Sequence, residues 1–147
     1  MYMLPKHIIN YMAGFFDSEG CIYINKQARG KNAKFHPTYQ GSASVTNTIK
    51  KPLILFLKYF GGRIYFVKEK GKRSDRYFWR IVSRDALNFC MIMQNYFLIK
   101  KQQAGVLIEL QKTITKTGPK TLPNKILKRR EDLYLKIRDL NKIGQER

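Results

Sequence analysis

The stretch Met12-Ala13-Gly14-Phe15-Phe16-Asp17-Ser18-Glu19-Gly20 decides the fold of this 147-residue chain. Pro5 suits the first turn of a helix, and apolar residues from Ile8 onward recur at the spacings of an amphipathic helix. The glycine that closes the stretch is a stop signal, so we expect the helix to end at the acidic residues. Ala13 and Gly14 remove side-chain bulk from one helix face, which lets another backbone approach closely.

The acidic residues of this stretch also point to chemistry. Asp17 and Glu19 are the only two of the ten carboxylates that fall in the first 68 residues. We expect a basic region that keeps two carboxylates to use at least one of them, most simply to hold a divalent cation.

The sequence after this helix predicts pairs of strands that alternate with helices. Glycine and proline residues separate the elements, and period-two alternation marks the strands. The expected elements are strands at 21–27 and 39–46, a helix at 52–60, a hairpin of strands at 63–68 and 77–82, and helices at about 83–97, 101–114 and 125–142. This order is typical of an α+β fold with an antiparallel four-stranded sheet backed by helices. We expect residues 1–116 to form a core domain, and residues 117–147 to form a linker and a C-terminal helical extension packed on it.

Each predicted strand has one apolar face and one face of amide, hydroxyl, aromatic and arginine side chains. In the first strand Ile22 and Ile24 point one way, whereas Tyr23 and Asn25 point the other. Helices would cover the apolar face, and the open face carries groups that can hydrogen-bond to base edges. Solvated sheet faces are often polar as well, so spacing alone leaves both interpretations open.

The charge of the chain favours a polyanionic partner. Lys and Arg total 29 against 10 acidic residues, which gives a net charge of +19. Such an excess suggests DNA, RNA or an anionic membrane as partner, with a merely soluble basic protein as the plainer alternative. We expect no membrane association, because the apolar runs are too short or too interrupted to span a bilayer. The N-terminus lacks a secretory pattern, and Cys21 and Cys90 lack metal-site spacing, so we expect an intracellular protein with reduced thiols.

The stretch from Met12 to Gly20 resembles the motif that names the LAGLIDADG family of homing endonucleases. Methionine replaces the first leucine, two phenylalanines replace the apolar pair, and Ser18 and Glu19 replace the alanine and the second aspartate. Residues 61–65 and 100–103 are also similar to this family, and the resemblance covers residues 6–142. It implies an αββαββα fold, hydrolysis of double-stranded DNA at a specific site with a divalent metal, and intron homing; no small-molecule substrate is expected.

The resemblance implies a homodimer, because the family packs this helix against a second copy of the motif and no second copy is found in the sequence. Ala13, Gly14 and Asp17 are then expected at the dimer interface, with Asp17 also organising the helix end. A two-fold symmetric dimer reads a palindrome or near-palindrome. The alternative is a helix that packs tightly inside its own subunit.

The resemblance also implies a set of catalytic residues. Glu19 corresponds to the metal-binding carboxylate, with the backbone carbonyl of Ser18 as second ligand and Mg²⁺ as the expected ion, for which Mn²⁺ or Ca²⁺ can substitute. Lys100 is expected to stabilise the transition state or perturb the attacking water, although an ordinary phosphate-contacting or solvated lysine fits equally well. The weaker candidates are Asn47, which would place water, Lys50 or Lys51, which would supply a cation, and Gln103, which would belong to the same pocket.

The DNA-binding residues are expected on the open sheet face and at the hairpin tips. The expected base-reading set is Tyr23, Asn25, Gln27, Arg29, Gln40, Ser42, Ser44, Arg63, Tyr65, Arg76, Phe78 and Arg80, with the register of the strand that begins near Arg63 left open. The expected phosphate contacts are Lys31, Lys34, Lys68, Lys70, Lys72 and Arg73. The run Lys128-Arg129-Arg130 is expected to be a solvated helix face.

Two alternatives to a DNA endonuclease remain open on the sequence. One is a derivative of the same fold that binds nucleic acid without cutting it, such as an intron RNA maturase. The other is an unrelated basic RNA-binding module, although no motif of the usual kinds is present.

Overall fold

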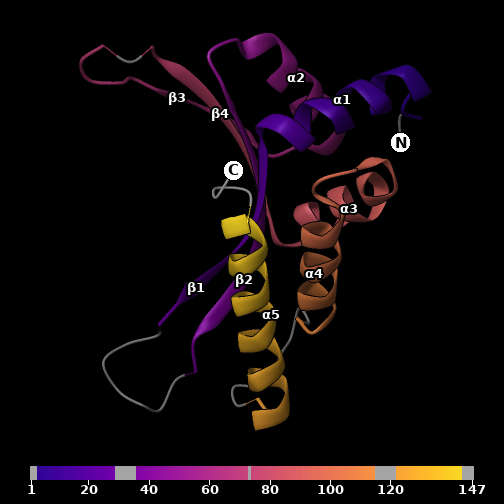
Figure 1. Cartoon of the computed structure of the whole chain (residues 1–147), viewed down its shortest axis with the longest axis vertical. Helices are drawn as coiled ribbons and strands as arrows, with labels where there is room; N and C mark the ends of the chain where they lie inside the picture. The colour runs from indigo at the N-terminus through magenta and orange to yellow at the C-terminus, as the bar shows by residue number, and fades with distance from the viewer. Residues whose placement is uncertain (1–2, 29–35, 73, 115–121, 144–147) are drawn as a thin grey trace.

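The computed structural model describes residues 3–28, 36–72, 74–114 and 122–143 (Figure 1). The elements are α1 Lys6–Glu19, β1 Gly20–Gln27, β2 Thr38–Asn47, α2 Lys50–Phe60, β3 Arg63–Val67, β4 Arg76–Val82, α3 Ser83–Met93, the 3-10 turn η1 Gln94–Tyr96, α4 Lys101–Lys112 and α5 Asn124–Ile143. The predicted α+β class and the αββαββα order are confirmed. Within these ranges, no helix is both long and apolar enough to cross a membrane.

The four strands form one antiparallel sheet in the order β1-β2-β4-β3. The helices gather on one side of this sheet, and the two hairpins extend from its opposite ends (Figure 1). Ile22, Ala43 and Trp79 point toward the helices and are fully buried. The opposite face carries the polar side chains, as the alternation predicts.

The glycine pair before β3 makes the tight return into the sheet. Gly61 and Gly62 have φ values of 76° and 85°, which favour glycine. A Cβ at Gly62 would lie 2.3 Å from the side chain of Ile81 and 2.5 Å from the carbonyl oxygen of Arg80. Trp79 Nε1 donates to the carbonyl oxygen of Gly61 at 2.9 Å, which fixes this turn to β4. The register of β3 against β4 settles which face each residue of β3 occupies. Arg63 pairs with Arg80, so both lie on the polar face.

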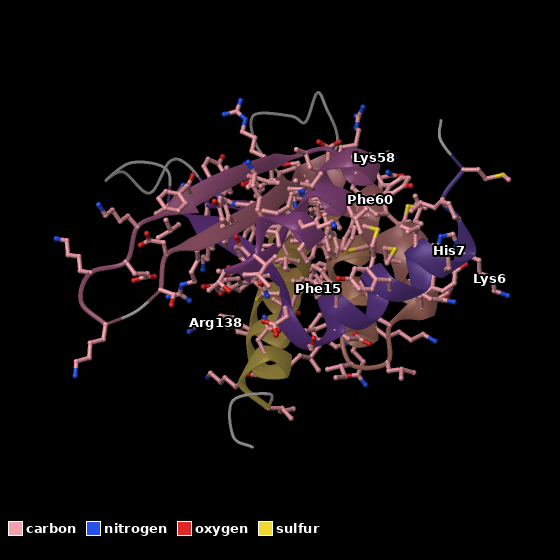
Figure 2. The ribbon with its side chains drawn as sticks, turned by 90° about the horizontal axis from the view of Figure 1, so that it is seen from above. Lys6, His7, Phe15, Lys58, Phe60 and Arg138 are labelled. Atoms are coloured by element: carbon pink, nitrogen blue, oxygen red, sulfur yellow. The ribbon has the colours of Figure 1, made fainter. Side chains whose placement is uncertain are left out.

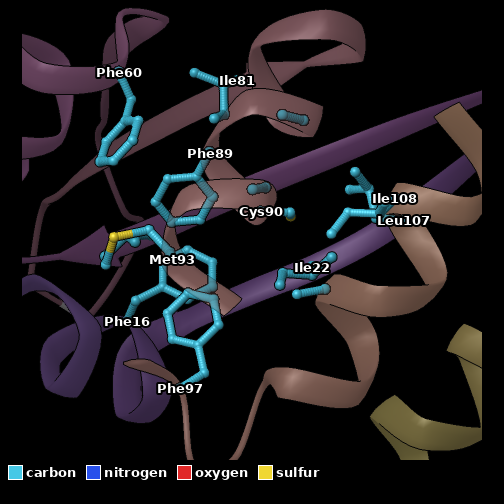
Figure 3. Packing of buried hydrophobic residues seen from close by; sticks show 14 of the residues in the cluster. Phe16, Ile22, Phe60, Ile81, Phe89, Cys90, Met93, Phe97, Leu107 and Ile108 are labelled. Carbon is cyan, nitrogen blue, oxygen red and sulfur yellow. The ribbon is translucent and has the colours of Figure 1, made fainter. Parts of the chain in front are cut away.

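The core is an aromatic cluster around Phe89 of α3 (Figure 3). The ring centroid of Phe89 lies 4.9 Å from that of Phe16, 4.8 Å from that of Phe60 and 5.5 Å from that of Trp79. Such pairs each contribute about 0.5–1.5 kcal/mol beyond their buried area. The cluster joins α1, α2, α3 and the sheet, and it thereby fixes the direction in which the end of α1 points.

The chain between α3 and α4 departs from the predicted long helix. The third helix ends at Met93 rather than near Phe97, and η1 and an extended Phe97 follow it. Phe97 is 2% exposed and stacks on Phe16 with a centroid distance of 5.2 Å. Burial of the Phe97 ring against Phe16 stabilises this path of the chain more than a longer α3 helix would.

The C-terminal helix α5 packs on α4 and β1 through Leu133 and Ile137, which are each 1% exposed. Arg130 is also buried, and its Nη2 donates to the carbonyl oxygen of Thr113 at 2.7 Å at the end of α4. The expectation that this basic run is a solvated face is therefore wrong for Arg130. Lys26 and Tyr39 both donate to the carboxylate of Glu131, and these hydrogen bonds lower the pKa of Glu131.

Candidate functional site

The end of α1 is tied to the start of α4 by Asp17. This residue is 8% exposed, and its carboxylate accepts hydrogen bonds from the backbone amides of Leu98 at 2.8 Å, Ile99 at 3.2 Å and Lys100 at 3.0 Å. Hydrogen bonds to a charged acceptor are among the stronger ones in proteins. Asp17 therefore organises the helix end, and its oxygens are engaged inside the subunit.

Asp17 places three of the expected catalytic residues around one cleft. Ser18, Lys100 and Gln103 line a cleft of about 530 Å³ between the end of α1, the start of α4 and the end of α5. Gln103 is 6% exposed, and its Oε1 has no hydrogen-bond partner among the described residues. The structure therefore brings Lys100 and Gln103 together, as expected, with Ser18 on the same cleft, and their catalytic roles stay predictions.

Lys100 also acts on the neighbouring strand. Desolvation by surrounding atoms raises the pKa of the Cys21 thiol above its ordinary value, and the Lys100 ammonium partly offsets this rise. That effect requires the ammonium to lie near Cys21, at the start of β1 and two residues beyond Glu19. The cation therefore sits beside the end of the motif.

Glu19 is the last residue of α1 and is exposed. Within the described ranges its carboxylate has no hydrogen bond or ion pair, and no group of three or more His, Cys, Asp or Glu residues could hold a metal in one subunit. The last turn of α1 has no basic side chain, and its free carbonyls, including that of Ser18, carry the negative end of the helix dipole. A carboxylate and a carbonyl are oxygen ligands that fit a hard divalent cation.

Asn47 and Lys50 lie apart from this cleft. Asn47 pairs with Tyr77, which places it on the helix-side register of the sheet, and its Oδ1 accepts the backbone amide of Ile49 at 2.9 Å. The ammonium of Lys50 lies 5.6 Å from the ring centroid of Tyr77. Neither residue lines the cleft that contains Ser18, Lys100 and Gln103, and the expected catalytic roles of Asn47 and Lys50 stay predictions. Lys51 is exposed beside Lys50.

A stripe of exposed residues runs along α1: His7, Asn10, Tyr11, Gly14 and Ser18. Their spacing of three and four residues places them on one helix face, and Figure 2 shows His7 at the outer end of this helix. A Cβ at Gly14 would meet no atom within 4 Å in this chain. Ala13 differs from the expectation, because it is 2% exposed and packs in the core of its own subunit.

Residues that are directly opposed on neighbouring strands point to the same face of the sheet. The register therefore gives the rows of residues that make up the polar face. From the β1–β2 hairpin to the β3–β4 hairpin, the opposed residues are Gln27 and Thr38; Asn25 and Gln40; Tyr23, Ser42 and Val82; Cys21, Ser44, Arg80 and Arg63; Thr46, Phe78 and Tyr65; and Arg76 and Val67. Every described member of the expected base-reading set lies on this face. Arg29, Lys31, Lys34 and Arg73 lie outside the described residues, whereas Lys68, Lys70 and Lys72 are exposed beside β3.

Two serines of the central strand are buried. Ser42 is 0% exposed and accepts hydrogen bonds from Asn25 at 3.3 Å and from Arg80 at 3.5 Å, and Ser44 is 6% exposed. Direct base contact by these serines is therefore contradicted. Their small side chains lie beneath longer neighbours, and Ser42 orients two of those neighbours.

The expected residue set omits Thr46. This residue is half-buried on the polar face, opposite Phe78, at the end of β2 nearest to Glu19. The alternation of Ser42, Ser44 and Thr46 in the sequence is the signal that places Thr46, rather than Asn47, on the polar face.

A polar sheet face beside an exposed carboxylate, in a chain of net charge +19, is consistent with an enzyme that binds and cuts nucleic acid. The chain belongs to the LAGLIDADG endonuclease family, whose model matches residues 12–117. It is a site-specific, metal-dependent DNA endonuclease of that family. The sequence has no significant match among curated proteins.

Solved structures show the same fold. The homing endonuclease I-CvuI, in complex with its target in the presence of Ca, is 20% identical, with a TM-score of 0.73 over 92% of this chain and 85% of that chain. The homing endonuclease I-TnaI is 16% identical, with a TM-score of 0.66 over 99% of both chains. I-SmaMI, bound to cleaved DNA, is 19% identical, with a TM-score of 0.64 over 89% of this chain and 43% of that chain.

Proposed function

We propose that two copies of this chain form a homodimer through α1 and hydrolyse a near-palindromic site in double-stranded DNA with Mg²⁺. The observation that carries the proposal is the position of Glu19. Its exposed carboxylate lies where the exposed stripe of α1 ends and the polar face of the sheet begins. A second copy docked on the stripe would bring two such carboxylates together over one DNA segment.

The surface around the stripe supports the dimer. Tyr11 is 49% exposed, and the neighbouring Leu98 and Ile99 are 93% and 61% exposed beside Asp17. Exposed apolar groups next to an unobstructed glycine favour close docking of another helix. An isologous contact repeats the same patch on both copies, so the DNA site would share the two-fold symmetry.

The two oxygen ligands at the end of α1 suit Mg²⁺. Glu19 supplies a carboxylate, and the last-turn carbonyl of Ser18 supplies a second oxygen. These two residues would hold the cation, which would supply an activated water and offset charge on the phosphate. Lys100 holds an ammonium beside this position, and Asp17 fixes the backbone that carries it, so its charge is placed before the substrate arrives.

The remaining basic residues would hold the DNA. Lys68, Lys70 and Lys72 are exposed beyond β3 and would contact phosphates, which adds affinity without sequence information. The polar face would then lie along the major groove, where each base pair presents a distinct set of donors and acceptors.

The test compares Glu19→Gln with Glu109→Gln, a matched change at an exposed residue of α4 that pairs with Arg129. Sites are first selected by wild-type cleavage of a randomised duplex library with Mg²⁺. Glu19→Gln should lower the cleavage rate more than about a hundredfold, since even the partners of metal ligands are worth about 10–100-fold. Binding of the same duplex in Ca²⁺ should stay within about threefold, because Gln keeps the size of the exposed side chain and a single surface change is worth about 0.5 kcal/mol or less. Absence of any double-strand break by wild type would overturn the proposal.

The homodimer has a separate test. Gly14→Gln should shift the protein to a monomer in sedimentation and abolish cleavage, because the new side chain fills the surface on which the second helix docks. Gly105→Gln is the matched control, since a Cβ at Gly105 also meets nothing within 4 Å. A wild-type monomer on DNA, or a dimer that Gly14→Gln leaves intact, would contradict the dimer through α1.

A further inference from the structure

The arginines of the polar face fall into two kinds. Arg76 is neutralised, because its Nε and Nη2 both donate to Oε1 of Glu69, at 3.1 and 2.5 Å. Neither Arg63 nor Arg80 has an ion pair in the part of the chain that the structure describes. Asp85 is the only carboxylate that lines the shallow recess beside these two residues, and it lies beyond ion-pair distance of both.

Arg63 and Arg80 are directly opposed on neighbouring strands. Like charges in that position destabilise a sheet, because the side chains lie about 5 Å apart. A pair of uncompensated guanidiniums is therefore costly in the free protein. Its presence on an open face points to a ligand rich in hydrogen-bond acceptors.

Packing holds Arg80 in place. Its Nε is fully enclosed and has no partner among the described residues, and its Nη2 makes only a 3.5 Å contact with Ser42. The side chain therefore starts opposite Ser44 and reaches Ser42 on the same strand, while the terminal nitrogens keep unused donors. A guanidinium fixed by packing rather than by strong hydrogen bonds is preorganised for a planar acceptor pair.

We infer that Arg80 and Arg63 each bind a guanine in every half-site, and that these two contacts dominate base discrimination. The inference rests on the proposed function. Guanine O6 and N7 form the planar acceptor pair that an arginine fork matches in the major groove. Phosphate contacts would use the same donors, but Arg80 lies on an inner strand with Arg63 directly opposite it, whereas the exposed lysines lie beyond the far end of β3.

The register also places these guanines relative to the cut. The row that contains Arg80 and Arg63 begins at Cys21, two residues after Glu19. Strands lie about 4.8 Å apart, so the two arginines are on the order of 10 and 14 Å across the sheet from Cys21. If this row lies along the DNA axis, one base per 3.4 Å puts both expected guanines within about five base pairs of the cut.

The experiment selects binding sites from a randomised duplex library in Ca²⁺, using the full chain and its Arg80→Lys, Arg63→Lys and Arg76→Met variants. Arg138→Met is the control for charge at a site off the sheet, on α5 (Figure 2). The wild-type consensus should contain two symmetry-related pairs of guanines. Each lysine variant keeps its charge but loses the fork, so each should lose about tenfold or more of the preference for guanine at one position. Arg76→Met should weaken binding to all sequences alike, because it leaves the carboxylate of Glu69 unpaired near the DNA.

The outcomes separate this inference from the proposed function. A clear symmetric consensus without guanine at these positions overturns the guanine contacts and leaves the endonuclease proposal intact. Uniform weakening by both lysine variants likewise overturns the inference, because it assigns the arginines to phosphates. Selection of no consensus at all would contradict the proposed function itself. If Arg80→Lys fails to fold by circular dichroism, the exposed Arg63 decides the outcome alone.

Discussion

The junction of α1 with α4 and the turn between β2 and α2 both carry residues that the family resemblance marks as catalytic, yet they are built differently. At the junction, one buried carboxylate binds three consecutive backbone amides, and this holds Lys100 beside the motif. At the turn, Asn47 uses its side chain locally, and Lys50 lies against Tyr77.

This difference between the junction and the turn indicates when a catalytic role known in the family can be assigned to a residue of this chain. Backbone hydrogen bonds to Asp17 fix the backbone of Lys100 at the end of α1. A residue near a strand end depends on register, and a shift of one residue moves its side chain to the opposite face. Roles at the junction are therefore firmer than roles at the turn.

The largest effect should come from breaking the junction. Asp17→Asn replaces one acceptor oxygen with a donor that faces a backbone amide. We expect the free energy of unfolding to fall by about 1.5–3 kcal/mol, the range for hydrogen bonds to a charged group, and cleavage to fall with it as Lys100 loses its support. Urea unfolding and cleavage assays measure the two effects.

Asp132→Asn is the matched control, because Asp132 is exposed on α5. Its effect on stability should stay within about 0.5 kcal/mol. An Asp17→Asn protein as stable as wild type would show that the three amides find other partners and that the junction is not fixed in this way.

The second effect compares the two lysines directly. Lys100→Met should lower the cleavage rate about a hundredfold at saturating DNA, the scale of one preorganised charge or donor. Lys50→Met should change it by about twofold, as for an ordinary surface residue. Equal losses in single-turnover assays would erase the distinction between the two regions.

The elements were predictable from sequence because periodicity and glycine positions report local structure. The stop at Gly20, the return at Gly61 and Gly62, and the open face of β4 all follow from such signals. The end of α3 was not predictable, because burial of Phe97 against Phe16 is a long-range contact that local pattern does not contain.

The candidate site was predictable in part for the same reason. The motif pointed to Asp17 and Glu19, but only the fold separates their environments into a buried one and an exposed one. The burial of Ser42 and the inward position of Ala13 depend on neighbours from other elements, so alternation alone could not assign them.

The third effect concerns the turn. Asn47→Ala removes the acceptor for the Ile49 amide at the start of α2. We expect a loss of about 0.5–1.5 kcal/mol in the free energy of unfolding, as for one hydrogen bond, with cleavage changed by less than about threefold. Asn95→Ala, an exposed change in η1, serves as control. A tenfold loss of cleavage in a stable Asn47→Ala protein would return Asn47 to the catalytic set.

The smallest effect uses Cys21 as a reporter of where Lys100 lies. Cys21 is exposed, whereas Cys90 is buried and burial raises the pKa of its thiol to about 12, so a maleimide should label Cys21 alone near neutral pH. The thiolate is the reactive form, and the raised pKa of Cys21 means that labelling should speed up as pH rises past the ordinary thiol range.

Removing the Lys100 charge should raise the pKa of Cys21 further, because that charge stabilises the thiolate. Lys100→Met should therefore slow labelling by roughly twofold or more at a fixed pH below that pKa, while Lys50→Met leaves the rate unchanged. Mass spectrometry of the labelled protein over time measures both rates. If Lys50→Met slowed labelling and Lys100→Met did not, Lys50 rather than Lys100 would lie at the end of the motif. The contrast between the two regions would then be reversed.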